Sequence, residues 1–99
     1  MEKQTYGMLI ERGKTYNKIN KAMVLKHVEN IRRLDDEGRL VLCGPTKGYP
    51  GVAGLIIFKA ENDEAAEAIC AAEPFVAEGY ATYKCFSMQV GNRENNYLL

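Results

Sequence analysis

The sequence has little of what usually marks a nucleic-acid, membrane or metal-binding protein. Its 99 residues carry 13 basic and 13 acidic side chains, so the formal net charge is zero. Nucleic-acid-binding modules normally show a clustered basic excess, and none is expected here. A chain of this length supports one hydrophobic core. We therefore expect a single domain over residues 1–99, with its core at about 5–90 and a C-terminal tail at 91–99.

Long apolar segments are also missing. The longest apolar run, Val52 to Phe58, is about a third of the length that a membrane-spanning helix needs. The first residues, Met1 to Gln4, are not followed by the apolar stretch typical of a signal peptide. We expect a cytoplasmic protein without a membrane partner.

Ligand patterns for metals and phosphates are equally scarce. The three cysteines, Cys43, Cys70 and Cys85, are odd in number and form no CxxC pair. This argues against a disulfide framework or a zinc site and favours buried free thiols. The segment Gly48 to Gly51 resembles a turn and lacks the spacing of a phosphate-binding loop. No metal and no cofactor is expected.

Four segments have the composition of β-strands. Gly44-Pro45 is expected to end the second strand, and the polar residues 11–19 are expected to connect the first strand to a helix. The third strand is apolar almost throughout, which is typical of a central strand. The predicted strands cover residues 5–10, 39–43, 53–59 and 80–90.

One helix is predicted between the first and second strands, and another between the third and fourth strands. Asn20 and Asn62 are predicted N-caps, Gly38 is a predicted left-handed C-cap, and Pro74 is expected to end the second helix. The apolar faces are predicted from spacings of three and four residues. They carry Val24, His27, Ile31 and Leu34 in the first helix, and Ala65, Ala66, Ile69 and Cys70 in the second.

The order β-α-β-β-α-β predicts a ferredoxin-like α+β fold. In this fold, a four-stranded antiparallel sheet carries both helices on one face. The other face would leave an apolar patch of a size that monomers rarely expose. We therefore predict a homodimer that forms through the open sheet face.

Candidate chemistry centres on His27, the single histidine of the chain. An imidazole can donate or accept a proton near neutral pH, and it needs a partner that fixes its tautomer. Glu73 is the candidate partner, because both helices would lie on the same face of the sheet. The sequence also permits a histidine that is merely packed in the core and a glutamate that faces water.

Two stretches resemble the YciI-like (YCII-related) family. The first runs from His27 through Gly38-Arg39-Leu40 to Gly44-Pro45, and the second from Glu61 through Ala72-Glu73-Pro74-Phe75 to Gly79. The resemblance covers residues 5 to 90. It implies a dimeric α+β barrel and a catalytic histidine/aspartate pair, whose histidine falls on His27. The family aspartate falls on Glu73, which is one methylene longer.

The chain departs from this family at a second position. Many members carry an arginine one turn before the histidine, whereas this chain has Val24. If an anion-binding group is present, it must come from elsewhere, and Lys21 and Lys47 are candidates.

Two function classes follow from the resemblance. The first is a small lyase or isomerase in which His27 and Glu73 move a proton on a small polar or aromatic metabolite. Gly44, Pro45 and Phe75 would then wall the substrate pocket. The alternative is a non-catalytic small-molecule-binding or assembly module on the same dimeric scaffold, which the changes at Val24 and Glu73 favour.

Overall fold

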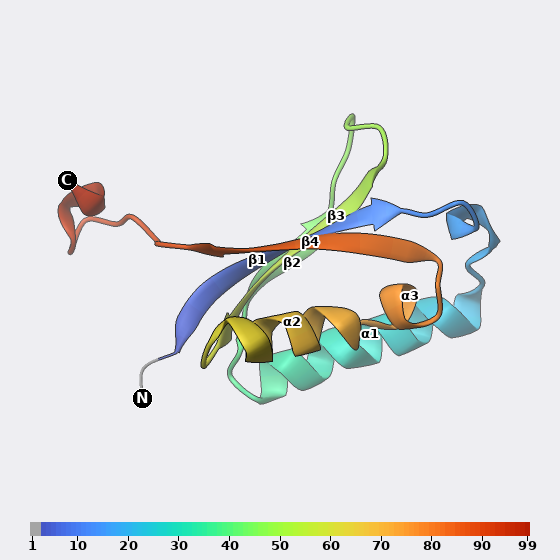
Figure 1. The fold of residues 1–99 in the computed structure, drawn as a ribbon, viewed down its shortest axis with the longest axis horizontal. Helices are drawn as coiled ribbons and strands as arrows, with labels where there is room; N and C mark the ends of the chain where they lie inside the picture. The colour runs from blue at the N-terminus through green and yellow to red at the C-terminus, as the bar shows by residue number, and fades with distance from the viewer. Residues whose placement is uncertain (1–2) are drawn as a thin grey trace.

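The computed structural model describes residues 3–99, so Met1 and Glu2 of the predicted domain lie outside the described residues. Four strands form one antiparallel sheet in the order β2-β3-β1-β4 (Figure 1). This order is that of the predicted ferredoxin-like fold. The strands are β1 (Gln4–Arg12), β2 (Leu40–Pro45), β3 (Val52–Ala60) and β4 (Ala81–Met88).

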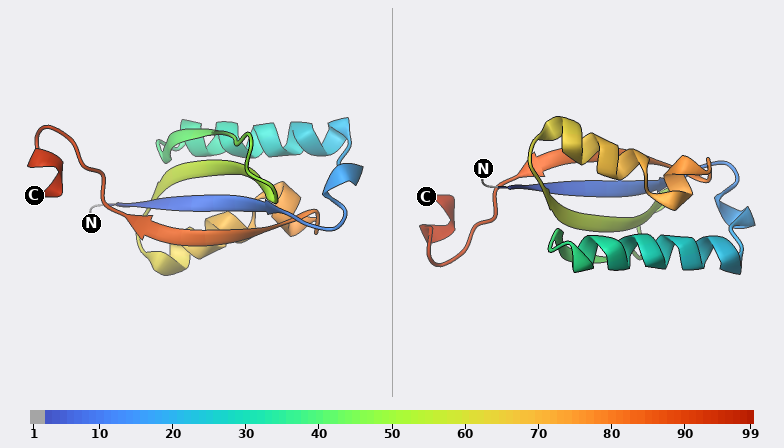
Figure 2. Two further views of the ribbon diagram at one scale, coloured as in Figure 1. Left: turned by 90° about the horizontal axis from the view of Figure 1, so that it is seen from above. Right: turned by 90° about the horizontal axis from the view of Figure 1, so that it is seen from below.

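The two predicted helices lie on one face of the sheet, as expected, and a short third helix that was not predicted lies on the same face (Figure 1). Figure 2 shows α1 running along the β2 edge and α2 lying under the opposite edge, near β4. The helices are α1 (Lys21–Asp36), α2 (Asp63–Ala71) and the short α3 (Pro74–Ala77), with 3-10 turns at Tyr16–Lys18 and Asn96–Leu98. Among residues 3–99, no helix combines the length and apolar character needed to cross a membrane.

The core fills the space between the sheet and the helices. Tyr6 of β1 and Phe58 of β3 are register partners, and their rings stack with centroids 6.0 Å apart. The Tyr6 hydroxyl donates to Asp63 Oδ1 at 2.7 Å, which joins β1 to the first turn of α2. Burial and this hydrogen bond raise the pKa of Tyr6 to about 12. The hydroxyl therefore stays protonated and acts as a structural donor.

The predicted helix caps are confirmed. The Asn20 side chain accepts the Met23 N–H at 3.0 Å, and the Asn62 side chain accepts the Ala65 N–H at 2.8 Å. Gly38 follows α1 with φ of 74°, a backbone conformation that side chains disfavour. These contacts form within four residues, so local sequence is sufficient to specify them.

The predicted packing face of α1 is partly wrong. Leu34 is buried as predicted, but Met23 and Asn30 complete the buried stripe. Val24 is 43% exposed, because α1 is rotated so that this residue lines a cavity beside the sheet. The buried Asn30 side chain accepts a hydrogen bond from Arg33 at 2.7 Å, which satisfies one polar atom on the buried stripe.

The predicted end of the second strand is also wrong. β2 continues through Gly44 and Pro45, which pair with Leu55 and Gly54 of β3. Proline is tolerated here because β2 is an edge strand and needs hydrogen bonds on one side only. The prediction of buried free thiols fails at Cys43, which is exposed on this strand, whereas Cys70 is buried and Cys85 partly buried.

The sheet face away from the helices carries exposed apolar side chains. They are Leu42, Phe86 and Met88, which are 54%, 44% and 38% exposed. Phe86 pairs with Gly7 across the sheet, and its ring lies directly over that glycine. A Cβ at position 7 would lie 2.4 Å from the ring, so the absence of a side chain there lets the ring lie flat.

Candidate functional site

The structure brings together the two residues that the sequence proposed as a pair. His27 lies in the second turn of α1, and its Nδ1 is 2.5 Å from Oε1 of Glu73, 46 residues away in the chain. A carboxylate can only accept, so Nδ1–H donates and fixes the imidazole tautomer. The other ring nitrogen, Nε2, takes no part in this contact, so it can exchange a proton with a group other than Glu73.

Glu73 is held by its second oxygen. Oε2 accepts the Val76 N–H at 3.2 Å, because Glu73 is the N-cap of α3 and Pro74 is its first residue. Because Pro74 was expected to end the second helix, Glu73 was expected at the carboxyl end of that helix, where the helix dipole disfavours an anion. In the structure, α2 already ends at Ala71, and the carboxylate lies at the amino end of α3, where the helix dipole favours an anion.

Burial distinguishes the two members of the pair. The Glu73 side chain is 1% exposed, whereas that of His27 is 24% exposed. Glu73 therefore does not face water, the alternative that the sequence left open for it. The carboxylate lies behind the imidazole, and the imidazole separates it from the cavity.

Phe75 fixes the plane of the imidazole. The two rings are parallel within 5°, with centroids 4.3 Å apart, and Phe75 itself is 7% exposed. Glu73 and Phe75 thus restrain His27 from two directions, one through a hydrogen bond and the other through stacking. Such restraint is what a positioned acid-base group requires.

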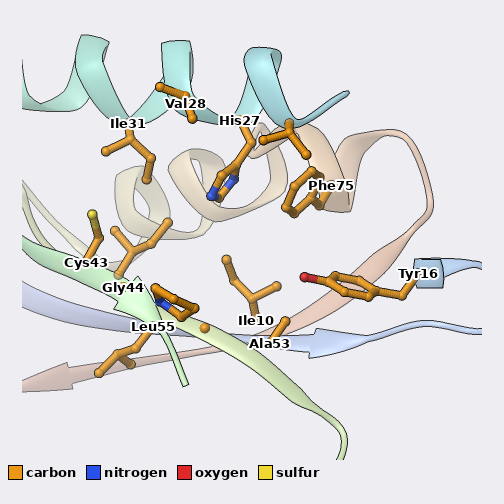
Figure 3. Close-up of a pocket in the computed structure, with 14 residues that line it drawn as sticks. Ile10, Tyr16, His27, Val28, Ile31, Cys43, Gly44, Ala53, Leu55 and Phe75 are labelled. Atoms are coloured by element: carbon orange, nitrogen blue, oxygen red, sulfur yellow. The ribbon is translucent and has the colours of Figure 1, made fainter. Parts of the chain in front are cut away.

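His27 and Phe75 line a cavity of about 410 Å³ between α1 and the end of the sheet (Figure 3). Gly44 and Pro45, the other two predicted substrate-binding residues, form part of the opposite wall. The rest of the lining is mostly aliphatic. The remaining lining residues are Ile10, Tyr16, Val24, Val28, Ile31, Cys43, Ala53, Gly54, Leu55 and Ile56.

Sequence reasoning missed Tyr16, which enters the cavity from the connection between β1 and α1. An isolated aromatic residue in an otherwise polar connection was the signal that could have indicated it. The two lysines considered as anion-binding groups, Lys21 and Lys47, are exposed and do not line the cavity. Val24 does line it, so the wall is aliphatic at the position where the family resemblance implies an arginine.

Two of the three cysteines, Cys70 and Cys85, lie outside the cavity lining. Burial raises the pKa of the Cys70 and Cys85 thiols, so both remain protonated and unreactive near neutral pH. Within residues 3–99, no group of three or more His, Cys, Asp or Glu side chains is arranged to hold a metal ion. The candidate site is therefore an oriented imidazole in a mostly apolar cavity.

A comparison with protein families identifies the family of this chain. The sequence model of the YCII-related domain matches residues 5–89, nearly the whole chain. The chain belongs to the YCII-related family. The family assignment agrees with the resemblance seen in the sequence alone.

Relatives of this YCII-related domain include Protein YciI from Escherichia coli O6:H1 and from Shigella flexneri. Each is 39% identical to it over 61 residues, a match that covers 54% of this chain. The match spans about 62% of the length of these curated relatives.

A solved structure has the same fold. It is 5-chloro-2-hydroxyhydroquinone dehydrochlorinase from Burkholderia phenoliruptrix AC1100, in complex with 2,5-dihydroxybenzoquinone. The TM-score is 0.72 at 13% identity, over 93% of this chain and 99% of that one. At this identity the similarity establishes the fold.

Proposed function

We propose that the protein is a small enzyme of the lyase or isomerase type, in which His27 transfers a proton on a small ring-containing metabolite. The observation that carries this proposal is the 2.5 Å contact between His27 Nδ1 and the buried Glu73 carboxylate. Glu73 orients the ring through Nδ1, so Nε2 can take a proton from carbon or oxygen and return it.

The cavity supports this role in two further ways. Its mostly aliphatic walls would surround the reacting atoms with a medium of low polarity, which strengthens polar interactions. Its volume of about 410 Å³ lies within the range of small-molecule sites and accommodates a monocyclic compound. The dehydrochlorinase of the same fold acts on such a compound, which is consistent with the proposal.

The test begins with a panel of monocyclic compounds screened by thermal shift, followed by turnover assays on those that bind. With an active substrate, we expect His27→Gln to lower kcat by about 10²–10⁴, the range of general acid-base catalysis. Glu73→Gln should also lower kcat, because the side chain no longer carries a charge. The loss should be smaller than for His27→Gln, because the glutamine oxygen can still accept the hydrogen bond from the imidazole. Leu25→Gln, an exposed change on the same helix, serves as the control.

A non-catalytic binding module is the second candidate, and one observation favours it. Val24 places an aliphatic group in the cavity lining, where the family resemblance implies a cation. Compounds that bind native protein and His27→Gln equally, without turnover in either, would establish this alternative and reject the enzyme.

We also propose a homodimer that forms through the sheet face away from the helices. Leu42, Phe86 and Met88 are exposed on that face, and Leu9 and Leu55 lie between them. A second copy would bury these side chains by an isologous contact, in which the same patch meets itself. Light scattering coupled to size-exclusion chromatography measures the expected doubling of mass.

A further inference from the structure

The cavity lining contains a second strongly polar side chain besides His27, that of Tyr16, and Phe75 lies between the two. Of its lining side chains, His27, Tyr16 and Cys43 carry polar atoms, and the Cys43 thiol is a weak hydrogen-bond donor. Tyr16 supplies a strong donor. Figure 3 shows its hydroxyl directed into the cavity, between the sheet and the ring of Phe75.

Phe75 connects the two polar groups. It stacks on His27 on one side and meets the ring of Tyr16 edge to face, with centroids 6.0 Å apart and planes at 81°. A ligand in the cavity would therefore contact the imidazole at one end and the phenol at the other. No hydrogen bond joins the Tyr16 hydroxyl to another residue of the 3–99 segment, so it is available to a ligand.

A cation lies against Tyr16. The guanidinium carbon of Arg12, the last residue of β1, is 5.4 Å from the centroid of the Tyr16 ring. Within residues 3–99, Arg12 takes part in no ion pair. It also borders a shallow hollow beside the β2–β3 turn, next to Thr46 and Tyr49. A cation stacked on an aromatic ring keeps its charge available to a second partner.

We propose that Tyr16, in the cavity lining, and Arg12, which stacks on the Tyr16 ring from outside that lining, together recognise an oxyanion, and that the ligand is a planar monocyclic compound with an anionic oxygen. The Tyr16 hydroxyl donates a hydrogen bond to that oxygen, and the Arg12 guanidinium supplies the positive charge. The proposal rests on the proposed function only in taking the cavity as a ligand site.

The binding of two matched probes tests the proposed oxyanion recognition. 4-Hydroxybenzoate and 4-hydroxybenzamide have similar size and shape but differ in charge. Isothermal titration calorimetry is performed with native protein, Arg12→Gln, Tyr16→Phe, and the control Arg32→Gln on the exposed side of α1. We expect native protein and the control to bind the acid at least tenfold more tightly than the amide. Arg12→Gln should abolish that preference without weakening amide binding.

The Tyr16→Phe variant separates the hydroxyl from the ring. It keeps the ring that packs on Phe75, so it should fold normally, and it should weaken acid binding about three- to tenfold through the lost hydrogen bond. Equal binding of acid and amide by native protein, an unchanged preference in Arg12→Gln, or no binding of either probe overturns the proposal.

The outcome is independent of turnover. A charge preference that depends on Arg12 supports the proposal even where no catalysis is found, and that result would refute only the enzymatic role of His27. Conversely, turnover of a neutral compound by a protein that lacks the charge preference would leave the His27 chemistry intact and reject this inference.

Discussion

The two faces of the sheet use the same strands in opposite ways. Toward the helices, Tyr6, Met8, Ile56 and Phe58 are each at most 3% exposed, and the polar groups among them are paired. On the other face, large apolar side chains such as Phe86 remain 44% exposed. Because side chains alternate along a strand, neighbouring residues serve separate purposes. The helix face makes the core and the site, and the open face is left for another surface.

The largest expected effect is a loss of stability from a substitution on the face of the sheet that the helices cover. Phe58→Ala should lower the free energy of unfolding by about 3–5 kcal/mol, because it leaves a cavity where Tyr6 stacks. Phe86→Ala on the open face is the matched control and should cost markedly less at the same protein concentration. Urea unfolding followed by circular dichroism measures both, and equal losses would show that the faces are not distinct.

The second effect concerns assembly through the open face. Leu42→Glu should raise the dissociation constant of the dimer at least tenfold, about 1.4 kcal/mol, because it puts a charge into the apolar contact. Leu25→Glu on α1 is the control, since both leucines are 54% exposed. Sedimentation equilibrium provides the constants. A native protein that stays monomeric, or two variants with the same dissociation constant, would remove the dimer proposal.

The smallest effect lies at the end of the sheet far from the cavity. Arg39, just before β2, donates to Glu61, just after β3, at 2.9 Å and lowers the pKa of that carboxyl group. A lowered folded-state pKa adds stability above the unfolded pKa and loses it as pH falls through the folded value. Native protein should therefore be slightly more stable than Glu61→Gln at neutral pH and equal to it in acid. A difference that grows on acidification would contradict this assignment.

What could be predicted from the sequence was largely local. Asn20, Asn62 and Gly38 act within a few residues of themselves, and each occupies its predicted cap. The pattern of strands and helices also fixed the fold, because the order β-α-β-β-α-β has few ways to bury its apolar faces. The His27 and Glu73 pairing was proposed from the fold and the family resemblance, and the contact is present.

The errors share a physical cause, since each depended on tertiary context. Pro74 was interpreted only as the end of one helix, whereas it also begins another and makes Glu73 its cap. The rotation of α1 that buries Met23 and opens Val24 to the cavity depends on what the helix packs against. Tyr16 was assigned to a connection, and only the folded chain places it beside Phe75.

Pro45 has a consequence for how molecules of this protein can associate. The next residue, Thr46, directs its N–H inward to Ala53, so by alternation the nitrogen of Pro45 faces the free edge of the sheet. That nitrogen carries no hydrogen, and a strand from another molecule would find a donor missing there. Pairing of this part of the β2 edge with a strand of another molecule is thereby disfavoured. This leaves the exposed apolar face, rather than this edge, for the homodimer proposed above.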